Sequence, residues 1–338
     1  MKRLMLTGAA PVVFAAMVLA AIVWAGAPSA HAQSTPAPPS DRLTLLGTGG
    51  GPIARTTRSQ PANLLQVGGK TFLIDIGDGT ARQLVRAGVK LNSVDAVLLT
   101  HLHFDHTAGI MGFVALDWQD RRTAPVRFYG PPGTRALLAD TLQALASGEA
   151  IFRPQLPDLP PMAAVFSATD WVVTAPQEVW NESGIKITAV ENTHYGTMHR
   201  EPTAHGIDRA YSYRFDLPTR SIVFTGDTGP SPALEALARD VDVLVSEVID
   251  IDAIAAGLAR RQAATGVDQA PLVAHMQQEH LTPENVGRLA AAARAKSLVL
   301  THFATPPGNE TFDRDAILRG IRKYYAGKVD FGEDLSTF

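Results

Sequence analysis

The chain has 338 residues, with 30 Lys and Arg against 33 Asp and Glu and a formal net charge of −3 at pH 7. Hydrophobic residues make up 46% and charged residues 19% of it, values that exclude a disordered or fibrous protein. The acidic balance argues against nucleic acid as a partner, because it supplies no polycation for a phosphate backbone. Cysteine is absent, which excludes disulfide scaffolds, thiolate metal sites and cysteine nucleophiles. Any metal must be held by His, Asp or Glu.

Residues 1–32 have the pattern of a secretory leader. The basic start Lys2-Arg3 precedes an apolar stretch from about Leu4 to Ala27, and Ala30-His31-Ala32 offers small residues for cleavage. An uncleaved membrane anchor is the alternative, because the apolar stretch approaches the roughly 20 residues that span a bilayer. We expect cleavage of this signal peptide, a flexible linker over residues 33–41, and a periplasmic or secreted protein with no membrane attachment.

From residue 42 onward, short β-rich runs alternate with helical patterns, which predicts a single α/β domain over residues 42–338. In chain order, the predicted elements are strands 43–47, 63–67 and 71–76, helix 80–87, strands 96–100 and 126–129, helix 134–146, strands 185–190, 211–216 and 221–225, helix 233–238, strand 241–245, helices 251–263 and 283–293, strand 297–301 and helix 314–324. Turns at residues 67–70 and 216–220 predict two antiparallel hairpins. Strands followed by helices in both halves predict two packed sheets with helices outside. The pattern is least regular over residues 111–181.

One predicted strand ends directly before four residues of metal-ligand type: His101, His103, Asp105 and His106. Alternation along an extended segment would place His101 and His103 on one side. A turn into the next helix would bring Asp105 and His106 to a second point nearby. The pattern therefore favours two adjacent metals over one.

Three further candidate ligands follow the same rule, because each lies at or just beyond the end of an apolar strand. Asp227 follows the strand at 221–225, and His302 follows the strand at 297–301. His194 lies shortly after the run at 185–190. A turn-capping role is the alternative for Asp227.

The spacing of these seven residues resembles that of the metallo-β-lactamase superfamily of dinuclear metallohydrolases. Within it, Leu46-Gly47-Thr48-Gly49, the stretch Asp75 to Thr80 and His280-Leu281-Thr282 resemble the branch that contains ribonuclease Z, arylsulfatases and related phosphodiesterases. The resemblance covers essentially all of residues 42–338. It implies an α/β fold, the αββα metallo-β-lactamase sandwich, as a single domain with its site at one edge of the two sheets.

The resemblance also implies a ligand set. It assigns His101, His103 and His194 to one metal, Asp105, His106 and His302 to the other, and Asp227 as a bridge between them. Asp105 is also a catalytic candidate. We expect two divalent metal ions, with Zn²⁺ as the default for imidazole and carboxylate ligands and Mn²⁺ or Fe²⁺ as alternatives.

Supporting roles follow from the same resemblance. Asp75 would orient the ligand loop through hydrogen bonds, with a turn cap as the alternative. His280 would reach the site without binding metal, as a proton donor or charge stabiliser oriented by Glu279. A surface histidine near a helix start is the alternative for His280. Glu247 is interpreted as a departure from the His–Glu pair of the ribonuclease Z branch, which weakens a transfer of tRNA processing.

The other candidate residues have weaker support for a functional role. We interpret His199, His205 and His275 as exposed or structural. The glycine-rich run at residues 47–52 predicts a tight turn near the metals, because proline stands where a dinucleotide fingerprint needs its last glycine. Several aromatic residues lie in or near loops expected to flank the site, although core packing is the alternative for each: Phe104, Trp118, Phe152, Trp171 and Tyr195.

The predicted function is that of an exported, dinuclear metal-dependent hydrolase that cleaves sulfate or phosphate esters, such as aryl sulfates or phosphodiesters. Its nucleophile would be a hydroxide shared by the two metals. A lactonase or β-lactamase-type acyl hydrolase is the alternative with the same fold, and a non-catalytic metal-binding protein is the alternative of another class. The expected partner is a small-molecule ester substrate, and a homodimer is left open beside a monomer.

Overall fold

The computed structural model describes residues 41–51, 53–197, 201–306 and 310–338. The predicted leader and nearly all of the predicted linker lie outside the described residues. The strands are β1 (Arg42–Gly47), β2 (Gly49–Gly50), β3 (Ala62–Val67), β4 (Lys70–Ile74), β5 (Ala96–Leu98), β6 (Val126–Gly130), β7 (Phe166–Asp170), β8 (Gln177–Glu182), β9 (Ile185–Glu191), β10 (Tyr211–Asp216), β11 (Ser221–Phe224), β12 (Val243–Ile249), β13 (Ser297–Ala304) and β14 (Lys328–Phe331). The helices are α1 (Thr80–Arg86), α2 (Phe104–Thr107), α3 (Ile110–Gln119), α4 (Thr134–Phe152), α5 (Met162–Val165), α6 (Pro232–Leu237), α7 (Ile251–Thr265), α8 (Ala270–Glu279), α9 (Pro283–Ala292) and α10 (Arg314–Arg322), with short 3₁₀ turns at Leu91–Ser93 and Arg153–Gln155.

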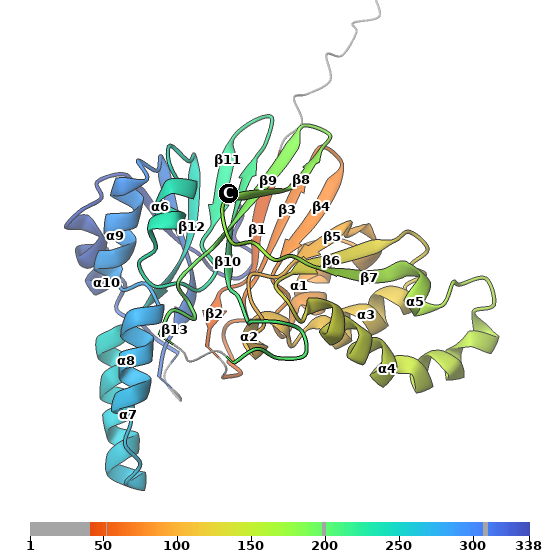
Figure 1. The fold of residues 1–338 in the computed structure, drawn as a ribbon, viewed down its shortest axis with the longest axis horizontal. Helices are drawn as coiled ribbons and strands as arrows, with labels where there is room; N and C mark the ends of the chain where they lie inside the picture. Colours follow the sequence, from red (N-terminus) through yellow and green to blue (C-terminus); the bar gives the residue numbers. More distant parts are fainter. Residues whose placement is uncertain (1–40, 52, 198–200, 307–309) are drawn as a thin grey trace, which may run out of the picture. The chain divides into compact units, whose positions relative to one another are not determined.

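Two mixed sheets form the centre of the described domain (Figure 1). The first has the strand order β1-β3-β4-β5-β6-β7, and the second has the order β14-β13-β12-β11-β10-β9-β8 with β2 added beside β13. β1, β3 and β4 are antiparallel, and β4 to β7 are parallel. The second sheet is antiparallel from β8 to β11 and parallel from β11 to β14. Both predicted hairpins are confirmed, as β3–β4 and β10–β11.

The core follows from side-chain alternation along the strands. Leu65 and Phe72 are buried in the apolar layer between the two sheets, whereas their neighbours Leu64 and Leu73 are buried on the opposite face, with α1, α3 and α4. The outer face of the second sheet packs in the same way against α6, α9 and α10. A sheet that buries both faces needs a layer on each side, so the predicted αββα sandwich is confirmed as a single domain.

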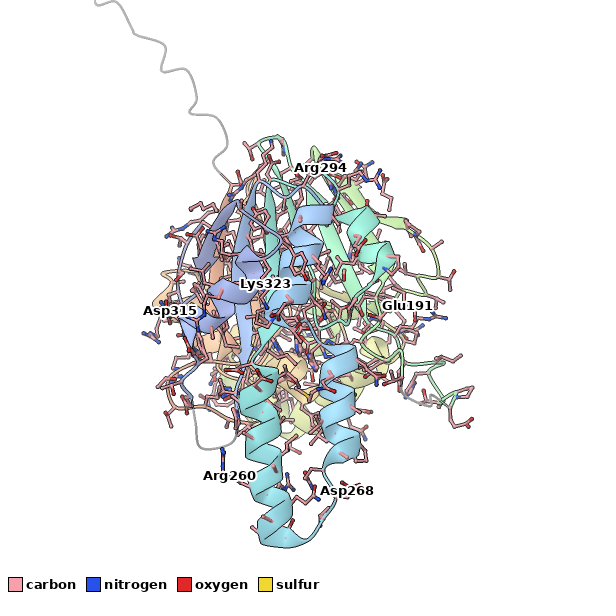
Figure 2. The ribbon with its side chains drawn as sticks, turned by 90° about the vertical axis from the view of Figure 1, so that its left-hand side faces the viewer. Glu191, Arg260, Asp268, Arg294, Asp315 and Lys323 are labelled. Carbon is pink, nitrogen blue, oxygen red and sulfur yellow. The ribbon has the colours of Figure 1, made fainter. Side chains whose placement is uncertain are left out.

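Every predicted strand and helix from residue 43 onward is present, with boundaries shifted by up to six residues. The sequence prediction lacked β2, β7, β8, β14, α2, α3, α5 and α8. Helices α7 and α8 form a hairpin that extends away from the sheets in both views (Figures 1 and 2). Within the described residues, no helix combines the length and apolar character needed to cross a bilayer.

The topology gathers strand ends at one edge. β9, β11, β12 and β13 run in the same direction, because β9 and β11 are both antiparallel to β10 and the later strands are parallel to β11. β4 and β5 of the first sheet are also parallel to each other. The carboxyl ends of parallel strands are where α/β proteins build their sites. Six of the candidate ligands follow β5, β9 or β11, and His302 lies near the end of β13.

Candidate metal centre

Three imidazoles form the first group of candidate ligands. The Nδ1 atom of His103 lies 3.1 Å from Nε2 of His101 and 3.0 Å from Nε2 of His194. These separations are close to the roughly 3.3 Å expected between neighbouring nitrogens around a tetrahedral zinc. His101 and His194 are fully buried. The three residues predicted to share one metal are therefore brought together, with ligand atoms within 4.8 Å of one another.

The second group consists of Asp105, His106, Asp227 and His302, all buried and also within 4.8 Å of one another. Oδ1 of Asp227 lies 3.3 Å from Nε2 of His106, and its Oδ2 lies 3.1 Å from Nε2 of His302. The same Oδ2 is 3.9 Å from Nε2 of His101 and of His194 in the first group. Asp227 thus faces both groups, the position that its predicted bridging role requires.

Hydrogen bonds behind the site fix how two of the imidazoles are protonated. Nδ1 of His194 donates to the backbone carbonyl of Glu279 at 3.0 Å, since that oxygen can only accept. Nδ1 of His106 lies 2.8 Å from Oδ2 of Asp75 and donates to it. A histidine must be neutral to bind a metal, and in the neutral form of each of these rings the Nε2 atom carries the lone pair that faces the site.

Asp75 is buried behind the ligand loop and has a left-handed backbone with φ of 62°. Its Oδ1 accepts from the backbone amide of Thr100 at 2.7 Å, and the Thr100 hydroxyl lies within 3.0 Å of both carboxylate oxygens. Asp75 therefore joins the strand end before His101 to the ring of His106. This placement suits the predicted orienting role, and an unusual φ held by such bonds is frequent at functional sites.

His302 enters the site through a β-bulge. Thr301 pairs with Glu247 and Phe303 pairs with Val248, so His302 has no partner on β12, and its φ is 51°. The extra residue turns the imidazole toward the metal-ligand cluster. A Cβ atom at Gly50 would lie 2.4 Å from Nδ1 of this ring, which explains why glycine stands there. The glycine-rich run was predicted to be a tight turn near the metals, but Gly49 and Gly50 form the short strand β2 beside β13. The run does lie next to the site, because the amide of Gly51 donates to Oδ2 of Asp105 at 2.9 Å.

The chemistry of these residues fits two divalent cations. In the part of the chain that the structure describes, Nε2 of His106, Oδ1 of Asp227 and Nε2 of His302 are buried without a hydrogen-bond partner, although buried polar atoms are normally paired. Burial raises the pKa of Asp227, but His302 and His106 hold it well below its usual value. Burial also raises the pKa of Asp105, and His106 and His302 bring it down to about 2. Two ionised carboxylates thus lie buried among unpaired ligand atoms, as a dinuclear metal site requires.

A correction concerns His280 and Glu247. Nδ1 of His280 lies 2.7 Å from Oε2 of Glu247, whose Oε1 accepts from the amide of Thr228 at 2.6 Å. The chain therefore has the His–Glu pair that Glu247 was predicted to lack. The carboxylate of Glu279 instead accepts from the amide of Thr197 at 2.6 Å, so the prediction that it orients His280 is wrong. A Glu in a strand that is apolar apart from Ser246 would need a partner when buried, and that signal could have identified the pair.

His280 also lies within 4.8 Å of His194 and Asp227, as a third group of ligand-type atoms. Its assignment as a proton donor rather than a ligand therefore remains a prediction. His275 was interpreted as exposed or structural, but it is 25% exposed and lines the cavity beside His280. His205 is exposed, and His199 lies outside the described residues.

Two of the five aromatic candidates adjoin the site. Phe104 lines the cavity next to the metal-ligand residues, and the ring of Tyr195 lies 5.3 Å from that of His103. The indole of Trp118 is buried and donates to the carbonyl of Pro160. Trp171 stacks on a tyrosine between the sheets, and Phe152 ends α4. None of these last three lines the metal-site cavity, because their elements pack elsewhere.

Comparison with known proteins identifies relatives of this chain. Residues 70–303 match the family model described as a β-lactamase superfamily domain. Ribonuclease Z of Mycobacterium avium (strain 104) is 32% identical over 300 residues, which cover 87% of this chain and 96% of that protein. Ribonuclease Z of Mycobacterium marinum (strain ATCC BAA-535 / M) is 30% identical over 298 residues, covering 87% and 96%.

Solved structures share the fold at lower identity. The metallo-β-lactamase fold protein YhfI of Bacillus subtilis has a TM-score of 0.61 at 18% identity, covering 89% of this chain and 99% of that one. The short form of human tRNase Z has a TM-score of 0.59 at 21% identity, covering 88% and 98%. The chain belongs to the metallo-β-lactamase superfamily, and ribonuclease Z proteins are among its relatives, as the motifs predicted. It is a metal-dependent hydrolase of this superfamily.

Proposed function

We propose that the protein is a dinuclear metal-dependent phosphodiesterase that acts on small-molecule diesters. The observation that carries this proposal is the position of Asp227, whose carboxylate faces both groups of candidate ligands while His280 lies next to them. Two metals held by the seven residues would supply an activated water and stabilise the charge that develops on the substrate. Imidazole and carboxylate ligands without thiolate suit Zn²⁺, with Mn²⁺ and Fe²⁺ as alternatives.

Residues of the chain would also supply a proton, orient the ligand rings and exclude water. Glu247 holds the ring of His280 through Nδ1 and leaves Nε2 free to donate a proton to a leaving oxygen. Asp75 and the carbonyl of Glu279 keep their imidazole partners in one orientation. The fully buried positions of His101 and His194 exclude bulk water behind the reaction centre. A proton donor of this kind matters most for an alkoxide or phenoxide leaving group.

Phosphodiesters rank above sulfate esters, because the relatives with about 30% identity carry the name of a nuclease, an enzyme that cleaves phosphodiester bonds. Esters of tetrahedral oxoanions rank above lactones and β-lactams, since two cations can hold two oxygens of such a group. An acyl substrate offers one carbonyl oxygen. Aryl sulfates and cyclic acyl substrates remain in the test as competing classes.

Cleavage of RNA is a second candidate function. The identity to ribonuclease Z and the pairing of Glu247 with His280 both favour it. The formal charge of −3 disfavours it, because RNA binding depends on neutralising phosphates with Lys and Arg. An RNA oligonucleotide with an unpaired 3′ end therefore belongs among the test substrates.

The decisive experiment compares kcat/KM across substrate classes at matched metal content. The substrates are a bis-nitrophenyl phosphate, a nitrophenyl sulfate, a lactone, a β-lactam and the RNA oligonucleotide, with Asp227→Ala as the inactive control. We expect the phosphodiester to be preferred by at least about tenfold, roughly 1.4 kcal/mol of transition-state binding. A preference of that size for any other class would replace the proposal.

We also propose that residues 1–32 direct export and are removed. Their basic start, apolar stretch and small residues support this. Cell fractionation with N-terminal sequencing of the mature chain tests it, and an intact Met1 on a protein that stays inside the cell would contradict it. Light scattering on the same sample distinguishes a monomer from a homodimer.

A further inference from the structure

An apolar cavity opens directly beside the metal centre. It has a volume of about 210 Å³, and its wall includes Asp105, Asp227 and His280 from the site. The rest of its wall is largely apolar, with Phe104 from the ligand loop and Leu272 and Met276 from α8. A substrate held at the metals would therefore project into an apolar space.

A second cavity, of about 240 Å³, continues from the first. The two share four wall residues: Gly51, Leu272, Met276 and Ala304. The second cavity extends to Ile254 and Leu258 on α7, each 7% exposed. Together the cavities form a groove that leads from the candidate ligands to the α7–α8 hairpin seen in Figure 2. We refer to these two adjoining cavities as the α8 groove.

The mouth of the α8 groove is also apolar. The side chain of Phe104 is 80% exposed although it stands between two candidate ligands, and Leu272 is 40% exposed. Exposed apolar surface of this kind is a common mark of a binding site. Two guanidinium groups lie in the wall: that of Arg55 is fixed by bonds to the carbonyl of Gly50 and the hydroxyl of Thr305, and that of Arg261 is exposed on α7. Among the described residues, the wall therefore has no row of cations of the kind that a polynucleotide would need.

We propose that the substrate is an amphiphilic ester, with its phosphate at the metal centre and an apolar alkyl or aryl substituent in the α8 groove. This inference rests on the proposed function for the headgroup, but the apolar substituent is a separate claim. The continuity of the groove with the candidate ligands carries it. A compact polar diester would leave the apolar wall in contact with water.

Binding of two phosphonates to the metal-loaded protein tests the claim without turnover. Methylphosphonate and hexylphosphonate share one headgroup, and each buried methylene should improve affinity by about threefold to fourfold. We expect hexylphosphonate to bind at least tenfold more tightly in a calorimetric titration. Metal content is measured after each titration to exclude extraction of the ions. Equal affinities, or no binding of hexylphosphonate, would overturn the inference.

Substitutions in the wall of the α8 groove test whether the apolar substituent binds there. Met276→Gln and Leu272→Gln should reduce the preference for hexylphosphonate to less than about threefold and leave the affinity for methylphosphonate unchanged. Val267→Gln is the matched control, because Val267 is 58% exposed in the turn between α7 and α8 and lines neither cavity. A hexyl preference that survives both groove variants would overturn the inference. Failure of the proposed function is distinguishable, since it would show as tight hexylphosphonate binding without hydrolysis of any phosphodiester.

Discussion

His280 and Glu247 lie 33 residues apart in the chain, yet Nδ1 of the imidazole is 2.7 Å from Oε2 of the carboxylate. Burial lowers the pKa of His280, but the neighbouring Glu247 carboxylate raises it above the ordinary value. Glu247 is held in turn by the amide of Thr228. The pair therefore favours the protonated form of the imidazole and holds the ring in one orientation beside the metal-ligand residues.

Replacing His280 by alanine should leave two metals bound and lower kcat by about 10²–10⁴-fold, because general acid catalysis contributes that much. The fall in kcat should be larger for diesters with poor leaving groups than for nitrophenyl diesters, because a nitrophenolate needs little protonation to leave. The measurement is kcat for a matched series of diesters, with metal content by elemental analysis. Loss of metal would show that His280 is a ligand, and unchanged kcat would show that it is a bystander.

The Glu247→Gln variant should change the pH dependence. With His280 as the predicted proton donor, its protonated form would be the active one, so the rate should fall as pH rises through its pKa. Removing the carboxylate removes the main interaction that raises this pKa, so the alkaline fall in kcat should move to lower pH. Glu279→Gln is the matched control, because it removes a buried carboxylate that does not pair with His280. If the alkaline fall in kcat stayed at the same pH in Glu247→Gln, the pairing of Glu247 with His280 would not control the proton-transfer step.

Strand ends could be predicted from the sequence because apolar runs of four to six residues are local signals. All seven candidate ligands were therefore found at or shortly after the predicted ends of these runs. Glu247 was misread because its partner His280 follows α8, a distant element that the bond from the Ile249 amide to the Leu281 carbonyl holds beside β12. Helix α8 was missed because Glu279 is its only fully buried residue, so its sequence has no regular apolar stripe. The edge strand β8 could have been predicted, because the dipeptide Ser183-Gly184 is typical of a hairpin turn. Both residues have positive φ and form the turn from β8 to β9.

Asp227→Ala should lower occupancy of both metal positions together. The carboxylate is the only predicted ligand that faces both groups within the described residues, so its removal weakens each. Native mass spectrometry and elemental analysis give the number of metals per chain. Asp240→Ala serves as the control, because that carboxylate is exposed and pairs with Arg294 on the surface. Loss of a single metal would show that Asp227 is a terminal ligand and contradict the bridging role.

Gly50→Ala should damage the second group of ligands without unfolding the protein. The new Cβ would lie 2.4 Å from Nδ1 and 2.6 Å from Cε1 of His302, so the imidazole must move away from its bulge position. The Cβ would also lie 2.7 Å from the backbone oxygen of His302, so we expect weaker binding of one metal, a lower kcat and a lower melting temperature. Gly148→Ala is the matched control, because a Cβ there meets no atom within 4 Å and lies inside α4. That substitution should be neutral or stabilise the helix by up to about 1 kcal/mol. Full metal content and normal kcat in Gly50→Ala would show that the ring of His302 has room to shift without loss of its ligand role.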